Sequence, residues 1–381
     1  MNLQVFDDGP SCFRLKIVMS MLSNRPIRIR NIRNKSKSPG VTDYEVNFLK
    51  LINLLSNGTV VNINDTGCEV NFSPGSLIGG EHTFDCSTER GLGYFLEPLL
   101  LLSPFSKTSL YLKLTGVTNN SIDPSVDIIL QTWLPLLKKF LPPASACALK
   151  LEIKKRGIAP KGGGLVVLSS KPAQQISPVQ IISPGKVYRV RGVAWTCRVS
   201  PAIASQLMHG AKDLLNSFLS DVYINLDQRK RDVAGECSGF GIVLWAETKE
   251  GTFYSAETTS DPEGSNQSQP IIPAELGNKA ASKLLDQIYL GGCADQSLQA
   301  AALTMMALEG GHNASQLLIS APTPYTVSSL RLIRQCLGVT FDLAYKELEE
   351  SAQDDSLETA PPPLIATCFG SGLKNVNLSI L

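Results

Sequence analysis

Between two predicted strands, over residues 148–155 and 164–168, the chain reads Arg156-Gly157-Ile158-Ala159-Pro160-Lys161-Gly162-Gly163-Gly164. Three consecutive glycines permit positive φ angles and a close approach of other backbone. The flanking Arg156 and Lys161 can hold a phosphate on the loop amides, although a tight turn that only needs the glycines is the simpler interpretation. The segment is not a Walker loop, because it lacks the GxxxxGK(S/T) spacing and joins two strands rather than a strand and a helix.

Strand-like runs alternate with amphipathic helical patterns on both sides of this segment. In the first part of the chain, isoleucines alternate with arginines over 26–33, a helix is predicted over 42–55, and a strand pair over 59–64 and 69–72. A similar order recurs at 91–102, 109–114, 125–140, 148–155 and 164–168. A weaker copy follows at 296–308, 316–320, 326–337 and 339–343. We therefore predict three diverged copies of one α/β unit.

A different kind of unit separates the second copy from the third. It has predicted strands at 187–199, 222–226, 241–246 and 252–256. Ser200-Pro201 is a good start for a helix, and the apolar face of that helix carries Ile203, Leu207, Ala211, Leu214 and Phe218. A loop is predicted over 259–269, followed by a helix from Pro273 to the residue before Gly291.

These patterns predict an α/β (α+β) fold with two domains and a tail. The large repeat domain comprises residues 1–184 and 285–346, and the inserted α/β domain comprises residues 185–284. Residues 347–381 form a C-terminal tail, because an acidic cluster and three consecutive prolines precede only one short predicted strand.

Composition excludes several classes of protein. The 381 residues are 43% apolar and 18% charged, which excludes a disordered or collagen-like chain. The nine cysteines form no CxxC pair and only three histidines are present, which argues against a zinc finger or ribbon and suits a reducing compartment. The longest apolar run, around 94–102, contains Glu97 and is shorter than the roughly 20 residues that span a membrane. The first ten residues lack the apolar core of a signal peptide.

Basic residues are clustered although the formal net charge is only +1. The three groups are Arg25, Arg28, Arg30, Arg33, Lys35 and Lys37; Lys150, Lys154, Lys155, Arg156 and Lys161; and Arg229, Lys230 and Arg231. If the strand arginines share a face with the loop lysines, they form a surface for an RNA backbone. Taken alone, each group is explained equally well as the solvent-exposed face of a strand, without any role in binding. Arg331 and Arg334 are i,i+3 neighbours on a predicted helix, where they either clamp a phosphate or only solvate the helix.

The motif of residues 156–164, followed by Leu165-Val166, resembles the signature of the RNA 3′-terminal phosphate cyclase superfamily. Residues 26–33 through Pro39-Gly40 and the run Ala294-Asp295-Gln296 are also similar to that superfamily. The resemblance extends from about Phe13 to Phe341. It implies a large domain of three βαβαββ-like repeats with a smaller α/β domain inserted before the third repeat, which agrees with the organisation predicted from periodicity.

The resemblance also implies a chemistry from which this chain departs. Active members of the family use a histidine nucleophile that takes AMP from ATP and passes it to an RNA 3′-phosphate, after which a 2′,3′-cyclic phosphate closes. Tyr325 occupies the position expected for that histidine. A phenol with a pKa of about 10 is largely protonated at neutral pH, and His312 precedes Tyr325 by 13 positions. The resemblance therefore implies that the nucleophile is missing.

Other expected nucleotide-contacting positions are partly kept. The resemblance carries over Arg14 and Arg33 as nucleotide-contacting arginines and Asp295 as the active-site aspartate. The glycine-rich run of the family is replaced by residues 7–12, and a third arginine position is Ser36. The residues that we expect to bind an anion or RNA are Arg14, Arg28, Arg30, Arg33, Arg156, Lys161, Asp295, Arg331 and Arg334.

The departures described above are similar to the cyclase-like branch of the superfamily. Residues 117–119, 123–127 and 238–241 also resemble that branch. That branch implies a non-catalytic ribosome-biogenesis factor of the nucleus and nucleolus, without a cofactor or metal. Its implied partners are a ribosome-assembly GTPase, pre-rRNA and small-subunit processome proteins, and not a membrane. Two alternatives stay open: an active cyclase with a relocated histidine, His312 or His82, and a metal-dependent pre-rRNA endonuclease that uses Asp295, Glu97 or another acid.

Overall fold

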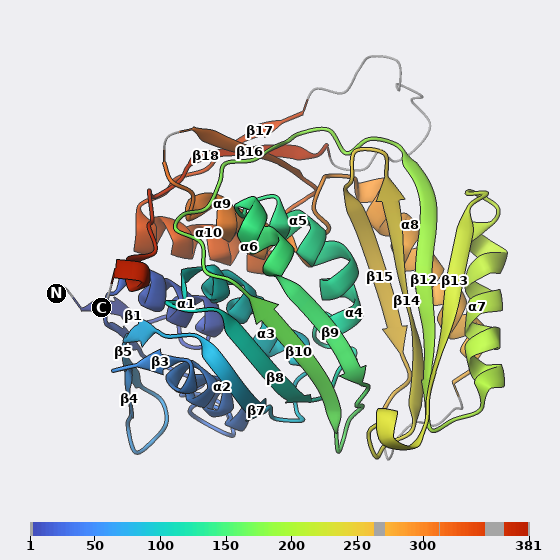
Figure 1. Ribbon diagram of the computed structural model, residues 1–381, viewed down its shortest axis with the longest axis horizontal. Coiled ribbons are helices and arrows are strands. Elements are labelled where there is room, and N and C mark those ends of the chain that lie inside the picture. The colour runs from blue at the N-terminus through green and yellow to red at the C-terminus, as the bar shows by residue number, and fades with distance from the viewer. Residues whose placement is uncertain (1–2, 263–270, 312, 347–361, 380–381) are drawn as a thin grey trace.

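The computed structural model describes residues 3–262, 271–311, 313–346 and 362–379 (Figure 1). Three four-stranded sheets share one plan, in which the first two strands are parallel and the other pairs are antiparallel. In spatial order the first sheet contains β1 (Gln4–Phe6), β2 (Ile27–Ile29), β5 (Val70–Ser73) and β4 (Val60–Ile63). The second contains β7 (Gly80–Asp85), β8 (Leu110–Gly116), β10 (Gly164–Ser170) and β9 (Lys150–Lys155). The third contains β11 (Gln180–Ile181), β16 (Ala314–Ile319), β18 (Leu364–Phe369) and β17 (Asp342–Tyr345).

Each sheet has a helix between its two parallel strands and a second helix before its antiparallel strands. The first helices are α1 (Phe13–Ser23), α3 (Leu92–Leu102) and α9 (Gln299–Ala307). The second helices are α2 (Asp43–Leu54), the continuous α4–η2–α5 segment (Val126–Ile128, Ile129–Trp133 and Leu134–Lys138) and α10 (Pro324–Leu337). Short elements complete this part: the β3–β6 pair (Ser56–Asn57 and Ser76–Leu77), η1 (Ser103–Phe105), α6 (Pro143–Ala148) and η5 (Val376–Ser379).

The helices pack together in the centre of the repeat domain. α1 contacts both α3 and α10, and α9 contacts α3 and α10. All eleven residues of α3 are buried, Glu97 included, so α3 lies at the centre of this helical layer. On β2, Ile27 and Ile29 are buried while Arg28 is partly exposed, as the alternation of the sequence predicts.

The inserted unit is a second α/β layer beside the repeat domain (Figure 1). Its sheet has the order β13 (Val222–Arg229), β12 (Val187–Cys197), β14 (Gly239–Thr248) and β15 (Phe253–Thr259), with η3 (Arg231–Val233) after β13. Helices α7 (Pro201–Leu215) and α8 (Pro273–Leu290) pack on one face and form a separate small core. Trp195 and Val243, from the other face, belong to the core of the repeat domain.

The mixed α/β fold predicted from the sequence is confirmed, and the structure adds three details of its organisation that the sequence does not show. β11 precedes the inserted unit and pairs with β16, so the insertion follows the first strand of the third sheet instead of preceding the third repeat. α8 continues past residue 284 to Leu290. β18 lies between β16 and β17, so residues 364–369 of the predicted tail form an inner strand. Local periodicity does not show the pairing of β11 with β16 or of β18 with its two neighbours, because each pairing joins segments far apart in the chain.

Smaller predictions also differ from the structure. Phe218 lies beyond the end of α7 at Leu215 and is 66% exposed, so it is not part of the predicted apolar face. The loop predicted over 259–269 starts one residue early, because β15 ends at Thr259. Residues 263–270, most of the predicted acidic tail (347–361) and His312 lie outside the described residues. No helix in the described part of the chain is long and apolar enough to cross a bilayer.

Candidate functional site

A cavity of about 310 Å³ lies where α1, α3 and the start of α10 meet. Its lining includes Arg14, Arg33, Arg90 and Tyr325, from four separate segments of the chain. We call it the arginine pocket. Arg14 and Arg33 are two of the arginines that the sequence singles out, and Tyr325 lies in the first turn of α10 beside them.

Tyr325 and Arg14 bind the same buried carboxylate in this pocket. The Tyr325 hydroxyl donates a hydrogen bond to Glu97 Oε1 at 3.0 Å, and Arg14 Nη1 lies 2.7 Å from Glu97 Oε2. Arg14 also donates to the Tyr94 carbonyl at 2.6 Å and stacks 4.2 Å over the Tyr94 ring. Burial and the Glu97 charge raise the pKa of Tyr325 above its usual range, so its hydroxyl stays protonated at neutral pH.

The other two arginines are also neutralised by acids. Arg33 donates to both oxygens of Glu45 at 2.7 and 2.8 Å, in a bidentate pair. Arg90 forms a similar pair with Asp123, with Nε 2.9 Å from Oδ2. An anion that entered the pocket would compete with a carboxylate at each arginine that it contacts.

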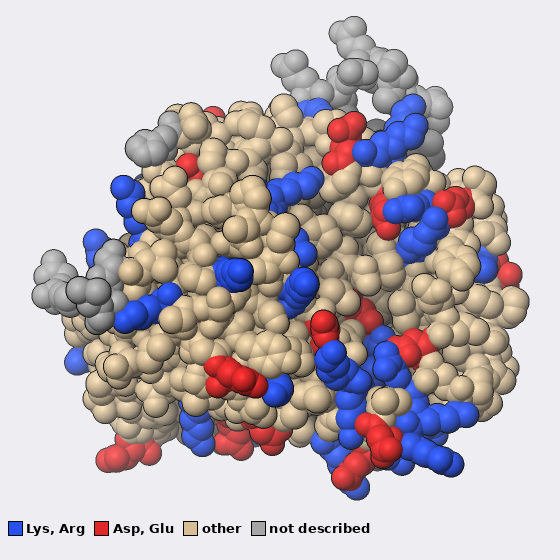
Figure 2. All heavy atoms as spheres, in the orientation of Figure 1, with Lys and Arg blue, Asp and Glu red and all other residues tan. Residues whose placement is uncertain are grey.

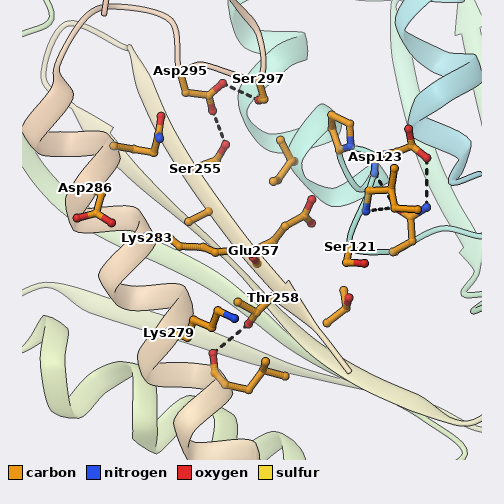
Figure 3. Close-up of a pocket in the computed structure, with 18 of the residues that line it drawn as sticks. Ser121, Asp123, Ser255, Glu257, Thr258, Lys279, Lys283, Asp286, Asp295 and Ser297 are labelled. Atoms are coloured by element: carbon orange, nitrogen blue, oxygen red, sulfur yellow. Dashed lines mark hydrogen bonds between the residues drawn. The ribbon is translucent and has the colours of Figure 1, made fainter. Parts of the chain in front are cut away.

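Asp295 does not line the arginine pocket but a larger cavity of about 830 Å³ between the repeat domain and the inserted unit (Figure 3). It is 3% exposed and accepts hydrogen bonds from Ser255, from Ser297 Oγ at 2.7 Å and from the Leu298 N–H at 3.0 Å. Burial raises the pKa of Asp295, although these donors oppose the shift. The expected grouping of Asp295 with Arg14 and Arg33 is therefore not found.

Glu257, on β15, points into the same cavity (Figure 3). One oxygen accepts the Ser125 N–H at 3.0 Å, whereas Oε2 is shielded from solvent and has no hydrogen-bond partner among the residues that the structure describes. Burial raises the pKa of Glu257 from its ordinary 4.5 to about 7. Glu257 is thus a titratable contact between the two units of the protein.

Glu257→Gln is expected to remove a pH dependence of stability. Between pH 4.5 and 7 the folded protein keeps the Glu257 proton longer than the unfolded chain does. The free energy of unfolding of the wild type should therefore fall, relative to the variant, by up to about 1.4 kcal/mol per pH unit as the pH rises through this window. Urea denaturation at several pH values measures the difference, and parallel profiles for the two proteins would contradict the assignment.

Arg156, the first residue of the glycine motif, is buried and does not lie on a surface that could bind RNA. It is 2% exposed, and its guanidinium donates to both oxygens of Asp127 at 2.7 Å and to Asp227 at 2.8 Å. Asp127 belongs to the repeat domain and Asp227 to β13 of the inserted unit. The guanidinium expected to bind an anion is instead held by two carboxylates of the chain, the buried Asp127 and the partly exposed Asp227.

The glycines of the motif serve the path of the chain. A Cβ on Gly157 would lie 2.0 Å from the Gly164 backbone nitrogen, and a Cβ on Gly164 would lie 2.7 Å from the Gly157 nitrogen. Only glycine fits such a close approach. This agrees with the simpler interpretation of the segment as a tight connection.

The family model for RNA 3′-terminal phosphate cyclase matches residues 6–343. This chain belongs to the RNA 3′-terminal phosphate cyclase family. The RNA 3′-terminal phosphate cyclase-like protein of Homo sapiens is 40% identical over 372 residues, which cover 98% of this chain and 97% of the relative. The rRNA processing protein rcl1 of Schizosaccharomyces pombe is 37% identical over 368 residues, which cover 96% and 95%. A probable RNA 3′-terminal phosphate cyclase-like protein of Caenorhabditis elegans is 40% identical over 375 residues, which cover 98% of each chain.

In this family member the remaining predicted residues lie on separate surfaces. Arg28 and Arg30 each lie 3.5 Å from Glu69 on the first sheet. Lys161 is in the loop between β9 and β10, 67% exposed in its side chain and 3.1 Å from Glu236. Arg331 and Arg334 are exposed on α10. The structure does not join the arginines of the first sheet to Lys161, because they lie in different sheets.

Arg90, Glu45 and Asp123 were not predicted as site residues from the sequence, and Glu97 was named only as a possible metal ligand. The available signal was Glu97, a lone acid inside an apolar run, which indicates a buried partner. Nothing in the sequence pairs Glu45 with Arg33 or Asp123 with Arg90. Within the described residues, no group of three His, Cys, Asp or Glu side chains is placed to hold a metal ion.

Proposed function

We propose that this protein is a non-catalytic member of its family that acts in ribosome biogenesis, in early processing of small-subunit pre-rRNA. Its similarity to cyclase-like proteins and to an rRNA processing protein supports this role. The observation that carries the non-catalytic part is the hydrogen bond from Tyr325 to Glu97, which also binds Arg14.

A cyclase of this family needs a neutral imidazole nitrogen as its nucleophile. At the position where the family resemblance places that nucleophile, this chain has Tyr325, a protonated phenol whose hydroxyl donates to a carboxylate in the arginine pocket. The pocket's described lining contains no histidine. His82 is half-buried on β7, the edge strand of the second sheet, where it hydrogen-bonds the Gly79 carbonyl at 2.8 Å, and it does not line the pocket.

The finer parts of the proposal concern partners and place. The protein would act in the small-subunit processome of the nucleolus, bound to a ribosome-assembly GTPase and to pre-rRNA, and would need no cofactor. The name of the fission yeast relative, an rRNA processing protein, and the high coverage of both chains support an assembly role of this kind. Because the arginines of the pocket are paired with carboxylates, the pocket is poorly suited to nucleotide chemistry. This supports a role in which the chain binds partners and does not catalyse a reaction.

Depletion of the protein from its own cells is expected to cause unprocessed small-subunit pre-rRNA to accumulate, as measured by northern blotting. Re-expression of the wild type or of Tyr325→Phe should restore processing equally, because phenylalanine keeps the ring and removes only the hydroxyl. Purification of the tagged wild type should recover the GTPase.

Normal processing after depletion would refute the biogenesis role, and a purification without a GTPase would refute that partnership. A Tyr325→Phe protein that is folded and abundant but fails to restore processing would give the hydroxyl a chemical role and contradict the non-catalytic part.

A further inference from the structure

Basic side chains gather at one end of the seam between the repeat domain and the inserted unit. Figure 2 shows this group at the lower edge of the molecule, over the ends of β9 and β13. We call it the basic corner and define it by the six residues Lys155, Lys161, Arg198, Arg229, Lys230 and Arg231. It combines Lys155 and Lys161 of one basic group of the sequence with the whole group 229–231, and adds Arg198, which directly follows β12.

Backbone hydrogen bonds fix the two sides of the basic corner to each other. The Arg156 N–H donates to the Val233 carbonyl at 3.2 Å, and the Gly235 N–H donates to the Arg156 carbonyl at 2.6 Å. Arg198 donates its N–H to the Arg229 carbonyl at 3.2 Å and its Nε to the Gly235 carbonyl at 2.5 Å. The cations therefore stand on a rigid frame, which lowers the entropy cost of binding a ligand.

Two arginines of the corner have a backbone conformation that residues other than glycine rarely adopt. The φ angle is 55° at Arg198 and 49° at Arg231. Such left-handed positions cost free energy and are concentrated at functional sites. This observation is independent of the charge of the corner.

Glu236 occupies a position among the cations that suits an anionic oxygen. Its Oε2 lies 3.1 Å from Lys161 Nζ. The hydrogen bond from Lys161 and the charges of Lys161 and Arg198, with a smaller effect of Lys155, lower the pKa of Glu236. Another nearby acid, Asp227, already binds Arg156 and Arg229.

Positive charge remains in excess at the corner. Lys155, Lys230 and Arg231 make no ion pair with any residue that the structure describes. Asp232 is the remaining acid of the segment 229–236. A ligand with several negative charges is therefore favoured over a single anion.

We propose that the basic corner binds the phosphate backbone of RNA, with a phosphate oxygen replacing the Glu236 carboxylate beside Lys161 and Arg198. The proposal rests on the proposed function, in which pre-rRNA is the partner. The chemistry of the corner favours RNA over an acidic protein, because protein interfaces are depleted in lysine and have an apolar centre. Val233 is the one large apolar side chain exposed in residues 229–236.

Two variants with opposite expected effects test the proposal. In Lys155→Glu/Lys230→Glu/Arg231→Glu, no ion pair among the described residues is lost, and affinity for a labelled oligouridylate should fall by about tenfold or more. The slope of log affinity against log salt should also decrease, by about 0.7 for each lost phosphate contact. Glu236→Gln should instead strengthen binding severalfold, because it removes the competing carboxylate. Fluorescence anisotropy with the full-length protein measures the affinity and the salt slope of each variant.

Lys50→Glu/Lys171→Glu/Lys249→Glu is the matched control, since it changes the net charge equally at exposed lysines that lie outside the basic corner and outside the basic groups of the sequence. The control should bind within about twofold of the wild type. An equal loss in both triple variants, weaker binding by Glu236→Gln, or better competition by polyglutamate than by RNA of equal charge would overturn the proposal. The last result would assign the corner to an acidic protein.

Failure of this inference and failure of the proposed function are distinguishable. If the wild type supports pre-rRNA processing in cells but the triple variant binds RNA as well as the wild type, the corner inference is wrong and the function stands. If the triple variant loses RNA binding while depletion leaves processing normal, the corner binds RNA and the proposed function is wrong.

Discussion

Arg156→Met is expected to lower the free energy of unfolding by about 3–5 kcal/mol, the usual cost of removing one partner from a buried ion pair. Methionine fills much of the same volume, so the loss comes mainly from charge. The Asp127 carboxylate, which is only 5% exposed, would be left buried without its bidentate partner. Asp227 would lose one of its two cations. In the wild type, Arg156 holds the pKa of Asp127 below its usual range against the opposing effect of burial.

Arg191→Met is the matched control for this effect. Arg191 also forms a bidentate pair, with Asp221 at 2.8 and 2.9 Å, but the Asp221 side chain is 51% exposed. Solvent screens such a pair, so its loss should change stability far less than the loss of Arg156. Urea denaturation of both variants gives the comparison. Equal losses would show that Arg156 is not the buried tie between the two units.

Tyr325→His is expected to form no covalent adenylate with ATP, although it restores an imidazole at the position where the family resemblance places the nucleophile. The new side chain would face Glu97, which still binds Arg14. Arg33 and Arg90 would remain paired with Glu45 and Asp123 and could not hold the triphosphate without losing those pairs. Electrostatic stabilisation of a transferring phosphoryl group needs such arginines free to bind it.

The double variant Tyr325→His/Glu97→Gln separates the two causes. It restores the imidazole and removes the charge that Arg14 binds. If only the double variant were labelled by ATP, the acid in the pocket would be the element that blocks the chemistry. Label on Tyr325→His alone would show that one substitution suffices and would contradict the role assigned to Glu97.

Most of the fold could be predicted from the sequence, because its signals are local. The alternation around β2 and the helical pattern of α2 depend on residues a few positions apart. The place of β18 could not be predicted, because it depends on pairing with β16 and β17 and not on its own pattern. The assignment of β11 to the third sheet could not be predicted for a related reason: β11 has only two residues, too few for a period to show.

The candidate site was less predictable than the fold. Arg14, Arg33 and Tyr325 lie in one pocket, as the family resemblance implies, but their charge partners come from distant helices and loops. Arg156 resembles a surface arginine in the sequence, since lysines precede it and a glycine loop follows. Its burial depends on Asp127 and Asp227, which are 29 and 71 positions away.

The most direct test of the central claim is incubation of the purified wild-type protein with Mg²⁺ and α-labelled ATP, followed by a denaturing gel without acid, beside an active cyclase of the same family. Acid is avoided because a histidyl phosphoramidate is acid-labile. The account predicts label on the active cyclase and none on this chain. Label on this chain would show that it retains a nucleophile and would contradict a non-catalytic role.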